Sequence, residues 1–176
     1  WKTDAKTSFA GTFDGQGCTI SGLYRSVSGT TNTYVGLFYG TTDSSTLRDF
    51  KLINSYFAYK DNANRASRVA GITAMGCGTY EAIYCDVILK NNAKVVGGIV
   101  SDGLAGEKLQ IKECWFDGEI ISGYSNASNY DVTIGGIMGW ARNATSVDID
   151  DCMFSGSIDV TGADRTYIAG ILSRVT

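Results

Sequence analysis

A four-residue motif recurs five times along the chain and limits the possible folds more than any other feature. Each copy has a β-branched aliphatic residue, two small or apolar residues and a final apolar residue. Successive copies begin 34, 27, 38 and 34 residues apart. Repetition with variable length is typical of stacked coils whose connecting loops differ. The copies are Val35–Phe38, Val69–Ile72, Val96–Ile99, Ile134–Ile137 and Ile168–Ile171.

A second motif follows each of the first four copies and alternates with a period of two, which is typical of β-strands. In its middle the alternation slips by one residue. We expect a corner or bulge at the slip, because it would keep both halves facing inward. The slip is polar in three copies, and Ile83-Tyr84 is the exception. The copies are Ser45–Leu52, Tyr80–Val87, Leu109–Phe116 and Val147–Phe154, and the polar slips are Arg48-Asp49, Lys112-Glu113 and Asp150-Asp151.

Glycine has a structural role in the first motif. Val96 and Ile99 are three residues apart, so a straight strand would point them in opposite directions. A glycine between them permits a bend or a close approach to a neighbouring backbone. Each repeat therefore offers three short strands, around the first motif, the second motif and a short tail such as Asp117–Ile120. No segment has a helical stripe of apolar residues, so we expect almost no helix.

These patterns predict an all-β chain folded as a right-handed parallel β-helix of about five coils, with three short strands per coil. The hand follows from strand twist and crossover preference. The chain has no proline, which suits a fold whose backbone N–H groups nearly all donate to ladders. A β-sandwich is the alternative, but it would not repeat one residue at one place in each repeat.

We interpret residues 1–176 as one β-helix domain, in which residues 1–34 lead into the repeats at 35–176. The chain begins at Trp1 without a methionine, and we expect it to be a piece of a longer surface polypeptide. It has no apolar run of about 18 residues, so we predict no membrane insertion. Its net charge of −3 argues against a large nucleic-acid surface.

The N-terminal segment Phe9–Leu23 reads FAGTFDGQGCTISGL and is followed by Val35–Phe38. With the later Val-Gly-Gly-Ile and Cys-x-Phe-x-Gly-x-Ile elements, it resembles the GLUG-type repeats of bacterial surface proteins, which are similar to filamentous-haemagglutinin-like β-helices. The chain departs from that pattern at Cys18, where such openings often have His, and at Tyr39, which replaces a glycine. The resemblance covers nearly the whole chain. It implies an extracellular adhesin at the cell surface or cell wall, and it brings no catalytic residue.

We therefore predict a non-catalytic structural or adhesive module that displays variable loops to a host-surface protein or a glycan, beside neighbouring repeats or domains of its own polypeptide. The absence of histidine removes Ser-His-Asp and Cys-His relays and histidine metal ligands. The alternative is a carbohydrate-active module, either a β-helix polysaccharide lyase or glycoside hydrolase, or a carbohydrate-binding module. Against an enzyme, the acids Asp86, Asp117 and Glu119 are scattered and form no recurring outward column.

Three long polar segments are expected to project as loops from one edge: Ser55–Arg68, Ile121–Thr133 and Thr161–Thr166. Aromatic side chains in and near these segments are the candidate ligand-binding residues, because aromatic faces stack on sugar rings. We predict no catalytic residue, no cofactor and no metal site. The candidates are Tyr56, Tyr59, Tyr124, Tyr130 and Trp140.

Cys85, Cys114 and Cys152 share one position of the second motif, where the first repeat has Phe50. A position that accepts Phe or Cys is apolar, so we favour an inward column of free thiols. A disulfide between stacked coils and a metal site are the alternatives. The pairing of Cys18 and Cys77 stays open.

Two acidic segments carry oxygen ligands of the kind that Ca²⁺ prefers. Asp148 and Asp150 alternate with apolar residues, so together with Asp151 they are better interpreted as a solvated strand face than as a Ca²⁺ site. The segment Asp61–Asn64 lacks the glycine and terminal glutamate of an EF-hand loop.

Overall fold

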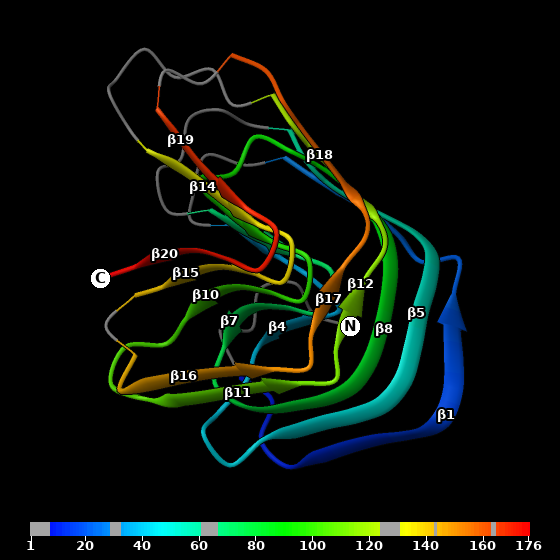
Figure 1. Cartoon of the computed structure of the whole chain (residues 1–176). Coiled ribbons are helices and arrows are strands. Elements are labelled where there is room, and N and C mark those ends of the chain that lie inside the picture. The colour runs from blue at the N-terminus through cyan, green and yellow to red at the C-terminus, as the bar shows by residue number, and fades with distance from the viewer. Residues whose placement is uncertain (1–7, 29–32, 61–66, 124–130, 143, 163–164) are drawn as a thin grey trace.

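The chain forms an all-β structure in which the strand pairings are parallel. The computed structural model describes residues 8–28, 33–60, 67–123, 131–142, 144–162 and 165–176, and these residues form β-strands and no helix. The chain passes through three sheets in a fixed order and completes five such circuits (Figure 1). The prediction of an all-β fold with stacked parallel strands is confirmed.

Sheet 1 is the largest sheet and bends around one whole side of the molecule (Figure 1). Its main path consists of β1 (Thr12–Ser21), β5 (Thr46–Tyr59), β8 (Gly78–Asn91), β11 (Lys108–Lys112) and β16 (Ser146–Asp150). Shorter strands complete it in the first, fourth and fifth circuits: β2 (Tyr24–Val27), β12 (Trp115–Phe116), β13 (Glu119–Ser122), β17 (Met153–Phe154) and β18 (Ser157–Val160).

Sheets 2 and 3 each take one strand from every circuit. Sheet 2 contains β3 (Tyr34–Val35), β6 (Arg68–Ala70), β9 (Val95–Gly97), β14 (Val132–Gly135) and β19 (Thr166–Ala169). Sheet 3 contains β4 (Phe38–Gly40), β7 (Thr73–Gly76), β10 (Val100–Gly103), β15 (Met138–Ala141) and β20 (Leu172–Val175). The four-residue motif thus forms a corner between two strands, not a single strand.

Glycine is required at this corner because the corners of successive circuits stack in contact. A Cβ added to Gly71 would lie 2.5 Å from the carbonyl oxygen of Gly98. A Cβ added to Gly98 would overlap the carbonyl oxygen of Gly136 and the ring of Phe116. The close backbone approach that the sequence predicted is therefore confirmed.

The slip in the second motif is a corner of left-handed backbone. Asp49 has a φ of 60°, Glu113 a φ of 51° and Asp151 a φ of 47°. Ala82 and Gln16 take the same conformation in the third and first circuits, with φ of 52° and 51°. The corner predicted at the three polar slips is confirmed, and its left-handed backbone turns the chain between the two strand halves.

The second copy of the second motif, which lies in the third circuit, is two residues out of the register that the repeat pattern predicts. Cys85 pairs with Leu52, whereas the repeat pattern predicts that Cys85 lies opposite Phe50. A shift of two residues preserves the alternation of inward and outward positions, so the pattern did not reveal the error. The corner of this circuit lies at Glu81-Ala82, so the exception at Ile83-Tyr84 came from the wrong register.

The prediction of one column for three cysteines is therefore wrong for Cys85. Cys114 and Cys152 do stack on the position of Phe50, since Lys112 pairs with Asp150 and Trp115 with Met153 on either side of them. All five cysteines are free thiols, and Cys85 and Cys114 are buried. The column contains Cys18, Phe50, Ile83, Cys114 and Cys152.

One apolar cluster fills the space that the three sheets enclose. It takes Leu52 from sheet 1, Val96 from sheet 2 and Val100 from sheet 3, and all three side chains are inaccessible to solvent. Burial of an aliphatic side chain of this size contributes about 1.5–3 kcal/mol. Because each circuit adds its own layer, the cluster runs along the stack.

Replacement of Gly98 by alanine should destabilise the protein by about 3 kcal/mol, since the new Cβ forces two backbones apart. The matched control is Gly170→Ala in the last circuit, where the nearest atom to a new Cβ is Cδ1 of Phe154 at 3.3 Å. This control should cost less than about 1 kcal/mol. Urea unfolding measures both changes, and equal costs would contradict the stacked corner.

Cys152 should be the thiol whose reactivity rises near neutral pH. A hydrogen bond from Cys114 lowers the pKa of Cys152 to about 7, whereas burial raises the pKa of Cys77 to about 11. Iodoacetamide labelling, followed by peptide mass spectrometry across pH, should show an inflection near pH 7 for Cys152. Cys114→Ala removes the donor and should move that inflection to higher pH. An unchanged inflection in this variant would contradict the thiol pair.

Candidate functional site

A column of two aromatic residues and a methionine, called here the aromatic column, lies on the outer face of sheet 1. Tyr84, Trp115 and Met153 follow one another in register through β8, β12 and β17. They point outward because their neighbours along the strands, such as Cys85 and Phe116, point into the core. Trp115 is 38% exposed and Met153 is 46% exposed. The rings of Tyr84 and Trp115 meet edge to face, with centroids 5.0 Å apart.

Carboxylates and hydroxyls line a surface hollow beside this column. The hollow has a volume of about 460 Å³ and lies over the third, fourth and fifth circuits. Asp86, Asp117 and Glu119 line it together with Ser155 and Ser157. The prediction that these three acids are scattered is therefore wrong. The acids gather because stacking of circuits places Asp86 beside Asp117, which is 31 positions further along the chain, and Glu119 follows in the same circuit as Asp117.

A chain of hydrogen bonds connects the aromatic column to the hollow. Trp115 donates its indole N–H to Oγ of Ser155 over 2.6 Å, and Ser155 donates to Oδ1 of Asp117. Tyr84 donates its phenol to Oδ2 of Asp117 over 3.1 Å. One carboxylate therefore fixes two aromatic rings. Partial burial raises the pKa of Tyr84, and the neighbouring Asp117 raises it further, so the phenol remains a donor at neutral pH.

Tyr56 extends the same outer face toward the first circuit. It lies in β5 and stacks on Tyr24, with ring centroids 5.4 Å apart and planes 8° apart. Tyr56 pairs with Ile88, and Ile88 pairs with Glu119, which lines the hollow. The candidate Tyr56 is therefore a strand residue on this surface and not a loop residue.

The other candidate ligand-binding residues are not found with Tyr56 on the outer face of sheet 1. Tyr59 ends β5 and is 1% exposed, so its predicted place in a loop is wrong and its ring faces no ligand. Trp140 lies in β15, away from sheet 1, among several cationic side chains. Tyr124 and Tyr130 lie outside the described residues. Sequence reasoning missed Trp115 and Tyr84, although their alternation with Cys114 and Cys85 marks them as outward positions.

The segments predicted as loops are partly strand. β5 extends to Tyr59 within Ser55–Arg68, and β13 reaches Ser122 within Ile121–Thr133. β19 begins at Thr166, where the segment from Thr161 ends. The polar composition did not separate outward strand positions from loop positions, because both face solvent.

The acidic segments form no evident metal centre in the described part of the chain. Asp148 and Asp150 are exposed on β16 and alternate with half-buried Val147 and Ile149, as expected for a solvated strand face. Asp61–Asn64 lies outside the described residues. Within the described ranges, no group of three or more His, Cys, Asp or Glu side chains is placed to hold a metal ion.

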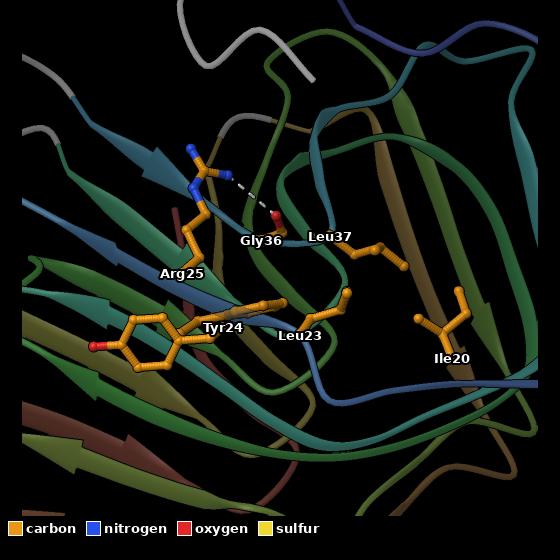
Figure 2. Close-up of a pocket in the computed structure, with 7 residues that line it drawn as sticks. Ile20, Leu23, Tyr24, Arg25, Gly36 and Leu37 are labelled. Carbon is orange, nitrogen blue, oxygen red and sulfur yellow. Dashed lines mark hydrogen bonds between the residues drawn. The ribbon is translucent and has the colours of Figure 1, made fainter.

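A larger cavity of about 540 Å³ lies at the N-terminal end of the core (Figure 2). Its lining is mainly apolar and includes Ile20, Leu23 and Leu37, which pack against the core cluster. Arg25 donates to the carbonyl oxygen of Gly36 over 3.4 Å, as Figure 2 shows. Both terminal nitrogens of Arg25 donate to backbone carbonyl groups and its Nε makes no hydrogen bond. With Arg25 as the charged side chain of a mainly apolar lining, this cavity offers no set of converging polar groups.

Comparisons with family models, curated proteins and solved structures return no match. A search of the described residues finds no helix with the length and apolar character needed to span a membrane.

Asp117→Asn should lower the pKa of Tyr84, because the variant removes the negative charge that disfavours the phenolate. A pH titration of tyrosine absorbance, compared with Tyr84→Phe, isolates this group. Asp148→Asn removes an exposed carboxylate elsewhere on sheet 1 and should leave the titration unchanged. A Tyr84 titration that is identical in Asp117→Asn would contradict the hydrogen-bond chain.

Proposed function

We propose that the chain is a right-handed parallel β-helix module of a secreted or cell-surface bacterial protein, and that it binds a glycan on the outer face of sheet 1. Five circuits through three parallel sheets support the β-helix. The right hand follows from the twist of strands and the preferred crossover between parallel strands. The bacterial surface location rests on the resemblance of Phe9–Leu23 to GLUG-type repeats.

The role proposed for this module is structural and adhesive, not catalytic. The stacked circuits provide a rigid support, and outward side chains form the surface that a partner meets. The proposed partner is a glycan on a host surface. A host-surface protein is the alternative partner. Neighbouring repeats or domains of the same polypeptide would continue the scaffold.

The observation that carries the glycan proposal is the hydrogen-bond chain from Trp115 through Ser155 and Asp117 to Tyr84. Sugar sites combine an aromatic surface, which contacts the C–H groups of the ring, with fixed polar groups that bind hydroxyls. Here both elements are present and are already oriented before a ligand arrives. Preorganised side chains lose less entropy on binding than mobile ones.

The charge of the hollow favours a neutral, hydroxyl-rich sugar. Asp86, Asp117 and Glu119 accept hydrogen bonds from hydroxyl groups and repel anionic groups. Neighbouring circuits are about 4.8 Å apart. A sugar ring would therefore contact side chains from two adjacent circuits, and a glycan chain would extend along the stack.

The competing function is a carbohydrate-active enzyme, and the three acids in one hollow favour it. Glycoside hydrolysis needs two carboxyl groups that flank the scissile bond. Turnover of a neutral or pectin-like polysaccharide by the protein, abolished in Asp117→Asn, would establish this enzyme and contradict the adhesive role.

A glycan array should identify a neutral glycan that binds the protein, and Trp115→Ala should weaken this binding at least tenfold. Tyr84→Ala should weaken it similarly, because both rings contact the sugar. Tyr167→Ala changes an exposed aromatic residue in sheet 2 and is the matched control, expected to bind as well as the parent. Circular dichroism checks that all variants remain folded. Failure of the parent to bind any glycan, or equal binding by Trp115→Ala, would contradict the proposal.

A further inference from the structure

Sheets 2 and 3 diverge from their shared glycine corner (Figure 1). A dense group of cationic side chains lies between these two sheets. Arg68 belongs to β6 and Lys94 immediately precedes β9, so both come from the side of sheet 2. Arg142 follows β15 and Arg174 belongs to β20, so these two come from the side of sheet 3. This group is separate from the outer face of sheet 1.

Two aspartates hold the arginines of this group. Oδ2 of Asp102 accepts from Nε of Arg68 and from Nη2 of Arg142, both over 2.6 Å. The side chain of Asp102 is 1% exposed and that of Arg68 is 5% exposed. Asp131 binds Arg174 over 2.9 Å and also lies 3.5 Å from an arginine that precedes β19, Arg165. Each carboxylate is thus shared by two guanidinium groups.

Trp140 forms the centre of the group. The guanidinium carbon of Arg142 lies 4.2 Å from the ring centroid, and that of Arg174 lies 4.6 Å from it. Nζ of Lys94 lies 5.5 Å from the same ring. The indole N–H donates to the hydroxyl of Thr176 over 3.0 Å. The ring therefore holds three cations near each other, which are attracted to its π face.

Positive charge exceeds negative charge in this group. The ion pairs that the described residues form here join four arginines to two aspartates, and Lys94 adds a fifth cation. Burial lowers the pKa of Lys94, and the positive charges of Arg68 and Arg142 lower it further. Half-buried charge in excess of its counterions is costly. A chain with net charge −3 concentrates this excess at one place.

Within the described part of the chain, two polar atoms of this group are buried with neither a hydrogen bond nor an ion pair. They are Nε of Arg142 and Oδ1 of Asp102, whereas Oδ1 of Asp131 accepts no hydrogen bond but lies 3.5 Å from Arg165. Buried polar groups in folded proteins nearly always have a partner. An arginine N–H without an acceptor, beside excess positive charge, is the arrangement that an oxyanion would complete.

We infer that this group is an oxyanion-binding site that takes a carboxylate or sulfate group. Arginine suits these groups because its fork of N–H donors matches the oxygens of a planar carboxylate or a tetrahedral anion. The unpartnered Oδ1 of Asp102 would accept from a hydroxyl group carried by the same ligand. The inference does not depend on glycan binding at sheet 1, since the two sites share no residue.

Calorimetric titration of the whole chain with sodium sulfate and with sodium glucuronate tests the site and separates the two anions. Glucose is the neutral control, and sodium chloride keeps the ionic strength constant. At least one anion should bind with one-to-one saturation, raise the melting temperature and shift the indole N–H resonance of Trp140. Absence of saturable binding by both anions would overturn the inference.

Two variants localise the binding. Lys94→Gln should weaken anion binding about tenfold, because it removes one cation beside Trp140. Arg165→Gln removes a side chain that is 61% exposed, so it should fold normally and weaken binding by a smaller factor. Lys90→Gln removes an exposed cation of sheet 1 and is the matched control, expected to bind like the parent. Equal affinity in the parent and both test variants would place the anion elsewhere and overturn the site.

Discussion

Parallel pairing between successive circuits is the constraint on which the rest of the structure depends. The backbone hydrogen bonds of all three sheets run across a spacing of about 4.8 Å, so each circuit has to repeat the shape of the one before it. The corners have to repeat as well as the strands. At the glycine corner, the backbones of Gly98 and Gly136 stack in direct contact. At the corner of sheet 1, Glu113 and Asp151 both adopt left-handed backbone, so the turn has the same shape in successive circuits. Proline, which donates no hydrogen bond, has little place in such a chain.

Stacking also determines how side chains gather. A residue on a strand has its nearest neighbours directly above and below it, and these come from other circuits. Inward positions therefore become apolar columns, such as the one that contains Cys114 and Cys152. Outward positions become columns in the same way, which is how Tyr84 and Trp115 come to lie together. A functional surface on this fold is assembled from residues about one repeat apart, and it needs no loop.

The sequence predicts the fold well because the repeats record the stacking directly. The glycine corner and the left-handed slip at Asp49, Glu113 and Asp151 follow from local patterns that backbone sterics enforce. The site was predicted poorly, because its residues depend on register between circuits. A two-residue error at Cys85 leaves every inward position inward, yet it changes which outward residues are neighbours. For this reason the repeat pattern does not predict that Asp86 and Asp117 are neighbours. The loop expected around Tyr59 was wrong for another reason, since the polar composition of its segment hides the end of β5.

The two candidate surfaces carry opposite charge and face different sides of the molecule. They therefore select different ligands. Three carboxylates line the hollow on sheet 1, whereas arginines and Lys94 surround Trp140 between sheets 2 and 3. The apolar core lies between sheet 1 and the other two sheets (Figure 1). A small ligand therefore contacts only one of the surfaces. Since an acidic group is repelled at the first and attracted at the second, a neutral sugar and an anion would occupy the protein independently, each held by side chains that the same stacking brings together.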